Sequence, residues 1–174
     1  SWLAERSGAT EPRDADGPEG PDDIHVDWSA VGRDSSRLGS VARAMADLLV
    51  TEDADVGLTV GIEKAGAPLA TSVADALDTD LGTYTPSKHR WDDGDVDDLG
   101  GSFSRNFATV AGRDCYLVDD TITSGTTMRE AIEAVRAEGG TPVACVVLVD
   151  KQGVDGFDGV PVHSLINVIR VGDE

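Results

Sequence analysis

Residues 115–127 constrain the fold of this chain more than any other stretch. They join an apolar segment to two adjacent carboxylates, Asp119 and Asp120, and then to a turn of small hydroxyl residues and a helix start. Such a turn presents backbone N–H groups and hydroxyls to an anion, and the helix dipole favours negative charge there. The carboxylates can accept hydrogen bonds from the hydroxyls of a sugar. The stretch therefore predicts a strand, turn and helix that bind a ribose 5-phosphate; an ordinary turn with a solvated acid pair is the alternative.

Strand-like and helix-like segments alternate along the rest of the chain. Helical spacing of apolar residues occurs at 38–49, 69–77 and 128–135, strands are expected at 56–61, 82–85 and 116–119, and a near-continuous apolar run occurs at 142–149. The last run is typical of a central parallel strand that is covered on both faces. This alternation predicts an α/β fold: a mostly parallel twisted sheet, doubly wound, with helices on both faces and ligands at the carboxyl ends of its strands.

Composition divides the chain into three parts. Residues 1–9 look like the end of a helix, and residues 10–23 are rich in Pro, Gly and acidic residues, which is typical of a linker. Residues 24–174 suffice for one domain, since 174 residues are too few for two ordinary ones. There is no apolar run long enough to span a membrane and no secretory signal, so we expect a cytoplasmic protein. Cys115 and Cys145 are expected to be core thiols.

Acidic residues dominate the charge. Asp plus Glu number 33 against 14 Lys plus Arg, a net charge of −19 that repels phosphate backbones, so this chain alone should not bind DNA. The excess resembles that of haloarchaeal proteins, with an acidic mesophilic protein as the alternative. The three lysines, Lys64, Lys88 and Lys151, each fall in a predicted site loop. His25 and His163 lack ligand-like spacing and are assigned to structure.

Residues 115–127 resemble the signature of the type I phosphoribosyltransferases, which use phosphoribosyl pyrophosphate (PRPP). By this resemblance Asp119 and Asp120 hold the ribose hydroxyls, and the turn grips the 5-phosphate. The resemblance also implies that Mg²⁺ is bound through ribosyl and pyrophosphate oxygens, with no direct protein ligand. The turn residues that it assigns to the ligand are Thr121, Thr123, Ser124, Gly125, Thr126 and Thr127.

Two further segments are similar to the orotate branch of this family. Residues 60–70 resemble its pyrophosphate loop, although the lysine comes one position earlier than in the family pattern. In residues 148–153, Lys151 has the position of an arginine that meets the carboxylate of orotate, and lysine cannot reproduce that bidentate contact. The loop residues placed beside the ligand are Glu63, Lys64, Ala65 and Gly66.

Residues 86–101 are polar, acidic and Gly-rich, and we expect them to form a mobile loop. In orotate enzymes this loop carries several lysines and a histidine that close over pyrophosphate. Here one Lys, one His and one Arg at positions 88–90 precede five aspartates within residues 92–98, so the catalytic charge is diluted; a solvated loop is the alternative. If the chain is an enzyme, the implied catalytic residues are Lys88, His89 and Asp120.

The whole chain resembles archaeal transcription regulators that join a helix-turn-helix to an orotate phosphoribosyltransferase-like domain and govern central sugar metabolism. Residues 24–38, 60–70, 87–91, 101–127 and 146–153 carry this resemblance. It implies that residues 1–9 are a helix-turn-helix remnant and that residues 24–174 sense PRPP or a related phosphorylated metabolite. Promoter DNA, bound through residues upstream of Ser1, and a second copy in a homodimer would be the partners. An active phosphoribosyltransferase for orotate or a purine is the alternative, and the contexts of the three lysines favour the sensor.

Overall fold

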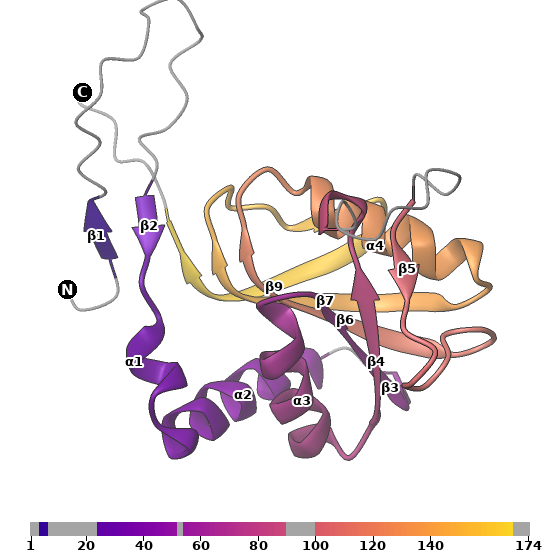
Figure 1. Cartoon of the computed structure of the whole chain (residues 1–174), viewed down its shortest axis with the longest axis horizontal. Helices are drawn as coiled ribbons and strands as arrows, with labels where there is room; N and C mark the ends of the chain where they lie inside the picture. The colour runs from indigo at the N-terminus through magenta and orange to yellow at the C-terminus, as the bar shows by residue number, and fades with distance from the viewer. Residues whose placement is uncertain (1–3, 7–23, 52–53, 90–99, 169–174) are drawn as a thin grey trace, which may run out of the picture.

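The computed structural model describes residues 4–6, 24–51, 54–89 and 100–168 of the chain (Figure 1). Most of these residues form a seven-stranded sheet and the helices packed on it. The strand order is β5 (Ser102–Phe103), β4 (Asp80–Thr85), β3 (Leu58–Ile62), β6 (Asp114–Ile122), β7 (Thr141–Asp150), β9 (Val160–Asn167) and β8 (Gly156–Phe157).

The central strands β4, β3, β6, β7 and β9 run parallel, whereas the short edge strands β5 and β8 are antiparallel to their neighbours. Strand β7 is buried throughout residues 144–150, as expected for a strand covered on both faces. The mostly parallel α/β fold predicted from the alternating pattern is therefore confirmed. Strands β8 and β9 were not predicted from the sequence.

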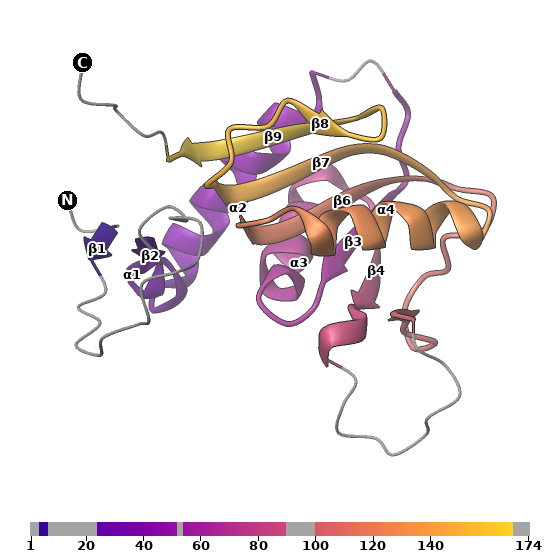
Figure 2. The same cartoon turned by 90° about the horizontal axis from the view of Figure 1, so that it is seen from above.

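Helices cover both faces of the sheet (Figure 2). The helices α2 (Ser35–Leu49) and α3 (Gly66–Leu77) pack on one face, and α4 (Thr126–Ala137) packs on the other. At the start of α2, the Asp34 carboxylate accepts the Ser36 N–H at 2.9 Å and caps the helix. The predicted layers are confirmed.

The apolar stripes of the helices fill the two cores. All four residues of the stripe predicted for α4 are buried: Met128, Ala131, Ile132 and Val135. On α3 the prediction is correct for Leu69 and Val73 but wrong for Ala76, which is exposed. Ala70 and Ala74 are buried on α3 instead, because they follow the spacing of the stripe set by Leu69 and Val73.

The two cysteines lie in the core, as expected. Cys115 on β6 and Cys145 on β7 are free and buried in neighbouring strands. Burial raises the pKa of the Cys115 thiol to about 12, and it raises the pKa of Cys145 further. Both side chains therefore pack as small uncharged groups.

The N-terminal part differs from the sequence expectation. Ala4–Arg6 form a strand, β1, that pairs antiparallel with β2 (Ile24–Val26), so the helix expected over residues 1–9 is wrong for these three residues. The predicted linker, residues 10–23, lies outside the described residues. The assignment of residues 1–9 to a helix-turn-helix remains a prediction. A short helix α1 (Ser29–Gly32) leads from β2 to α2.

Two further boundaries need correction. Strand β6 continues through Asp119 and Asp120 to Ile122, because it keeps pairing with β7 as far as Asp150. The predicted loop begins with an ordered 3₁₀ turn, η1 (Ser87–His89), and its residues 90–99 lie outside the described part. None of the helices in the described part of the chain is long and apolar enough to cross a membrane.

Candidate functional site

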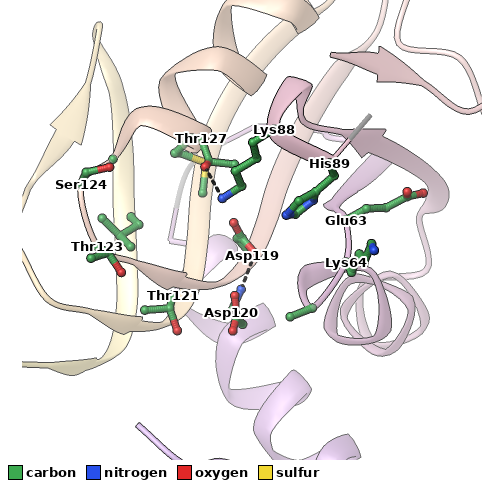
Figure 3. Close-up of a pocket in the computed structure, with 14 residues that line it drawn as sticks. Glu63, Lys64, Lys88, His89, Asp119, Asp120, Thr121, Thr123, Ser124 and Thr127 are labelled. Atoms are coloured by element: carbon green, nitrogen blue, oxygen red, sulfur yellow. Dashed lines mark hydrogen bonds between the residues drawn. The ribbon is translucent and has the colours of Figure 1, made fainter. Parts of the chain in front are cut away.

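A cavity of about 350 Å³ lies where β3 and β6 end and α4 begins (Figure 3). Parallel strands bring their carboxyl ends to one edge of a sheet, so the segments that follow them meet there. The residues that line the cavity are Glu63, Lys64, Ala65, Lys88, His89, Asp119, Asp120, Thr121, Ile122, Thr123, Ser124, Gly125, Thr127 and Met128.

The acid pair lies between the walls of the cavity. Asp119 Oδ1 accepts the backbone N–H of Asp120 at 2.8 Å. Burial raises the pKa of Asp119 well above its usual range, the negative charge of Asp120 raises it further, and the Lys88 ammonium opposes both effects. A hydrogen-bond donor that approaches Asp119 would favour its charged form, as the hydroxyls of a sugar do.

One wall of the cavity is the hydroxyl turn, residues 121–127, which leads into α4. Gly125 takes a left-handed conformation with φ of 78° and begins the helix without a side-chain cap. The Thr126 N–H donates to Oγ of Ser124 at 3.4 Å, and the N–H groups that follow it in the first turn are available to an anion. Glycine is required at this position for a second reason: a Cβ there would lie only 2.5 Å from Cζ of Phe157.

The segment after β7 supports the hydroxyl turn from behind. The buried Asp150 carboxylate accepts the N–H groups of Gln152 and Val154 at 2.7 and 2.8 Å. This contact fixes Gln152, whose side-chain amide donates to the carbonyl oxygen of Thr123 at 2.5 Å. The turn is thus held at Thr123 by a hydrogen bond and at Gly125 by the Phe157 ring.

The opposite wall is made by the loop between β3 and α3. The peptide bond between Glu63 and Lys64 is cis. The Glu63 carboxylate points away from the acid pair and accepts the Thr85 hydroxyl at 2.7 Å (Figure 3). Lys64 is exposed beside the cavity. At Gly66, a Cβ would lie 2.8 Å from Cα of Asp119, so only glycine lets α3 start this close to β6.

The turn η1 adds a cation and an imidazole to this wall. Lys88 Nζ donates to Oγ1 of Thr127 at 2.9 Å and so bridges the two walls (Figure 3). The Nδ1 atom of His89 is buried and has no hydrogen-bond partner among the described residues. It can therefore donate to or accept from a ligand in the cavity. Arg90, the third basic residue predicted here, lies outside the described residues.

The cavity brings together residues from all but one of the predicted site segments. Three predicted site residues are not among those that line it: Gly66, Thr126 and Lys151. Gly66 starts α3 behind the loop, and Thr126 is in the first turn of α4. The backbone N–H of Lys151 donates to the carbonyl oxygen of Ile122 at 3.0 Å, so Lys151 follows β7 behind the hydroxyl turn.

Sequence reasoning missed several residues at the site. Ile122 and Met128 line the cavity, although their apolar character indicates a core position. Gln152 and Phe157 support the turn from 29 and 32 residues further along the chain. The one sequence signal for Gln152 was its position next to Lys151, a predicted site residue. No group of three or more His, Cys, Asp or Glu side chains suited to a metal ion occurs in the described ranges.

Comparison with known proteins gives consistent results. The family model described as the phosphoribosyl transferase domain matches residues 27–158. The Transcriptional regulator GfcR of Haloferax volcanii is 66% identical over 175 residues, which cover 100% of this chain and 83% of the relative. Proteins of the same name are 58% identical in Halobacterium salinarum, over 99% of this chain and 82% of theirs, and 41% identical in Methanocella arvoryzae, over 98% and 83%.

Solved structures share the fold at low sequence identity. An adenine phosphoribosyltransferase from Thermoanaerobacter pseudethanolicus has a TM-score of 0.67 at 19% identity, over 83% of this chain and 88% of the other. An orotate phosphoribosyltransferase of Mycobacterium tuberculosis, in complex with PRPP, has a TM-score of 0.62 at 20% identity, over 82% and 80%. These likenesses establish the fold, on which many different functions are built.

Proposed function

Because this chain belongs to the phosphoribosyl transferase domain family and to the family of archaeal GfcR regulators, we propose that it is the effector-sensing domain of a transcription regulator. Its effector is PRPP or a related phosphorylated ribose, bound in the cavity at the start of α4. The regulator acts on promoter DNA in the cytoplasm, as a homodimer. The chain has a net charge of −19, which repels the phosphate backbone of DNA, so the DNA contacts come from residues outside it.

One observation carries the proposal: two of the three lysines of the chain line the same cavity as the acid pair and the hydroxyl turn. The sequence has 14 Lys and Arg residues against 33 acidic ones, and Lys64 and Lys88 both line this cavity. Beside them the N-terminus of α4 has no side-chain cap. Two ammonium groups and the positive end of the helix dipole attract an anion with more than one negative group.

A phosphorylated ribose matches the arrangement of these groups. In the proposed complex the 5-phosphate lies at the hydroxyl turn, and the ribose hydroxyls donate to Asp119 and Asp120. A pyrophosphate at the other end of the ribose meets Lys64, Lys88 and His89. Among the described residues of the lining, Asp119 and Asp120 are the only adjacent acids, and no cluster of three metal ligands occurs there. Mg²⁺ would therefore be held mainly through the oxygens of the ligand.

The surroundings of the lysines favour sensing over catalysis. Lys151, which has the position of the orotate-binding arginine in the enzymes it resembles, is not among the residues that line the cavity. Charge development in a phosphoribosyl transfer calls for preorganised cations, and the described part of the lining supplies two. The second candidate is an active phosphoribosyltransferase for orotate or a purine, which the acid pair and hydroxyl turn would also serve.

Calorimetric titration with PRPP and Mg²⁺ in high salt tests the binding site. We expect saturable binding at one site, and no measurable heat at millimolar PRPP would contradict the proposal. Release of pyrophosphate with orotate, adenine or guanine distinguishes the two candidates. We expect no turnover, whereas rapid turnover would favour the enzyme.

Gel shifts on promoter DNA test the regulatory half of the proposal. The chain alone should leave the DNA unshifted. A version extended by the part of the Haloferax volcanii relative that this chain does not cover should bind DNA, and PRPP should change its affinity. Such a change is the coupling between two sites that defines an effector. DNA binding that is indifferent to PRPP would contradict the sensor.

A further inference from the structure

Glu130 on α4 fastens the turn η1 to the helix that starts at the cavity. Its Oε1 atom accepts the backbone N–H of Ser87 at 2.8 Å and the Tyr84 hydroxyl at 2.9 Å. Thr127 lies three residues earlier on the same face of α4, and its Oγ1 atom accepts a hydrogen bond from Nζ of Lys88 at 2.9 Å. Helix α4 therefore holds η1 at two points: the Ser87 backbone and the tip of the Lys88 side chain.

The two contacts differ in strength. Burial would raise the pKa of Glu130, but the hydrogen bonds from Ser87, Tyr84 and the Gly101 backbone outweigh it and lower the pKa below its usual value. The carboxylate is thus charged, and the hydrogen bonds that it accepts from Ser87 and Tyr84 are charge-assisted. The Lys88 side chain, by contrast, is exposed and has four rotatable carbons, so its ammonium group stays near Thr127 only if its backbone is fixed.

We propose that Glu130 is a positioning residue, which holds the backbone of η1 so that the Lys88 ammonium group reaches into the cavity. The inference rests on the proposed function, in which Lys88 contacts the ligand. It adds that Glu130, a residue outside the lining, determines the position of Lys88. Ser87 directly precedes Lys88, and η1 itself has one 3₁₀ hydrogen bond, from the His89 N–H to the Pro86 carbonyl at 2.9 Å. Beyond the end of β4 at Thr85, Glu130 thus holds the backbone one residue before Lys88.

A double-mutant cycle with PRPP and Mg²⁺ as the probe, on the whole chain, tests this role. Lys88→Met should weaken PRPP binding about tenfold, since it removes a charge-assisted contact. Glu130→Ala should weaken it by a similar factor, and Glu130→Ala combined with Lys88→Met should bind no more weakly than Lys88→Met alone. Glu133→Ala, which removes the same charge from an exposed position on α4, is the matched control and should bind as the wild type does.

Glu130→Gln keeps one side-chain oxygen, which can still accept both hydrogen bonds, and removes the charge. We expect a loss of about threefold, because the two hydrogen bonds become neutral, and this loss should vanish in the Lys88→Met background. Tyr84→Phe removes one donor but keeps the Ser87 bond, and should bind within about twofold of the wild type. These two variants decide the question even if Glu130→Ala fails to fold.

The outcomes separate this inference from the proposed function. If the wild type does not bind PRPP, both are overturned. If the wild type binds PRPP, two results overturn the role of Glu130 alone: unchanged affinity in Glu130→Ala, or a loss that persists in full when Lys88 is already methionine. The second result would mean that Glu130 acts through the general stability of the fold.

Discussion

The two walls of the cavity are built differently. The hydroxyl turn is held from behind by the Phe157 ring under Gly125 and by the Gln152 amide on the Thr123 carbonyl. The opposite wall presents Lys64 and Lys88, both exposed, on a loop and a single 3₁₀ turn. The first wall is therefore preorganised for a small fixed group such as a phosphate, and the long lysine side chains of the second can adjust to the part of the ligand beyond the ribose.

Under the proposed function, this difference suggests that the two walls have separate roles in ligand binding. A rigid turn supplies affinity for the common part of phosphorylated ribose ligands. A wall of flexible lysines discriminates among ligands by the charge at their other end, because ammonium groups act as adjustable point charges. The acid pair on β6 lies between the walls and serves both.

Removal of the acid pair should have the largest effect, since it disables the part that the two walls share. Asp119→Asn combined with Asp120→Asn should abolish measurable PRPP binding, because two charged acceptors for the ribose hydroxyls are lost. Titration calorimetry measures the loss, and circular dichroism checks that the fold is intact. Asp114→Asn, at the exposed start of the same strand, is the control. Unchanged affinity in a folded double variant would refute the assignment of ribose to these acids.

A variant that removes the support of the hydroxyl turn should have the second-largest effect. Phe157→Ala removes a buried ring that touches Gly125, and it should lower the free energy of unfolding by about 3–5 kcal/mol. The hydroxyl turn loses its support, so affinity for ribose 5-phosphate should fall together with affinity for PRPP. Denaturant unfolding and calorimetry measure the two effects. If Phe157→Ala binds ribose 5-phosphate as tightly as the wild type does, the turn does not depend on support from behind.

Substitution of a lysine in the opposite wall should weaken ligand binding less, and it should affect only ligands that extend beyond the ribose. Lys64→Met should weaken PRPP binding several-fold, roughly the value of one exposed charge contact, and leave ribose 5-phosphate binding unchanged. Lys151→Met is the matched control, because Lys151 does not line the cavity. An equal loss of PRPP affinity in both variants would indicate that lysines act through the overall charge of the chain and not through direct contact with the ligand.

The two walls also differ in how far the sequence predicts them. The acid pair and the hydroxyl turn occupy residues 115–127 without interruption, and their chemistry depends on local order, so the sequence alone identifies them. The apolar stripe of α4 and the apolar run of β7 are equally local signals. The opposite wall combines Lys64 with Lys88 from a different loop, and only the resemblance to a known family joined these segments.

Supports that act across the fold could not be predicted. Phe157 and Glu130 carry no motif, and their roles depend on which residues the sheet order places next to them. The end of β6 was misjudged because its length is set by pairing with β7, not by its own sequence. The short strand β8 pairs over only two positions, too few for an alternating pattern to be recognised.

The smallest expected effect concerns the proton on Asp119. Burial, together with the charge of Asp120, raises its pKa above the ordinary value of 3.8. Between 3.8 and the raised pKa, the folded chain holds a proton that the unfolded chain has released. The contribution of Asp119 to the free energy of unfolding must therefore decrease as the pH rises through this window. Asn carries no such proton, so Asp119→Asn should gain stability relative to the wild type with rising pH.

Ligand binding should show the opposite dependence. The ribose hydroxyls need a carboxylate that accepts hydrogen bonds, so affinity of the wild type for PRPP should fall when the pH drops below the raised pKa of Asp119. Bound ligand favours the charged form, and PRPP should in turn lower that pKa and release a proton on binding. Calorimetry in buffers of different ionisation enthalpy measures this proton release directly. Release that is equal in the wild type and in Asp119→Asn would place the proton on another group and separate Asp119 from the contact with ribose.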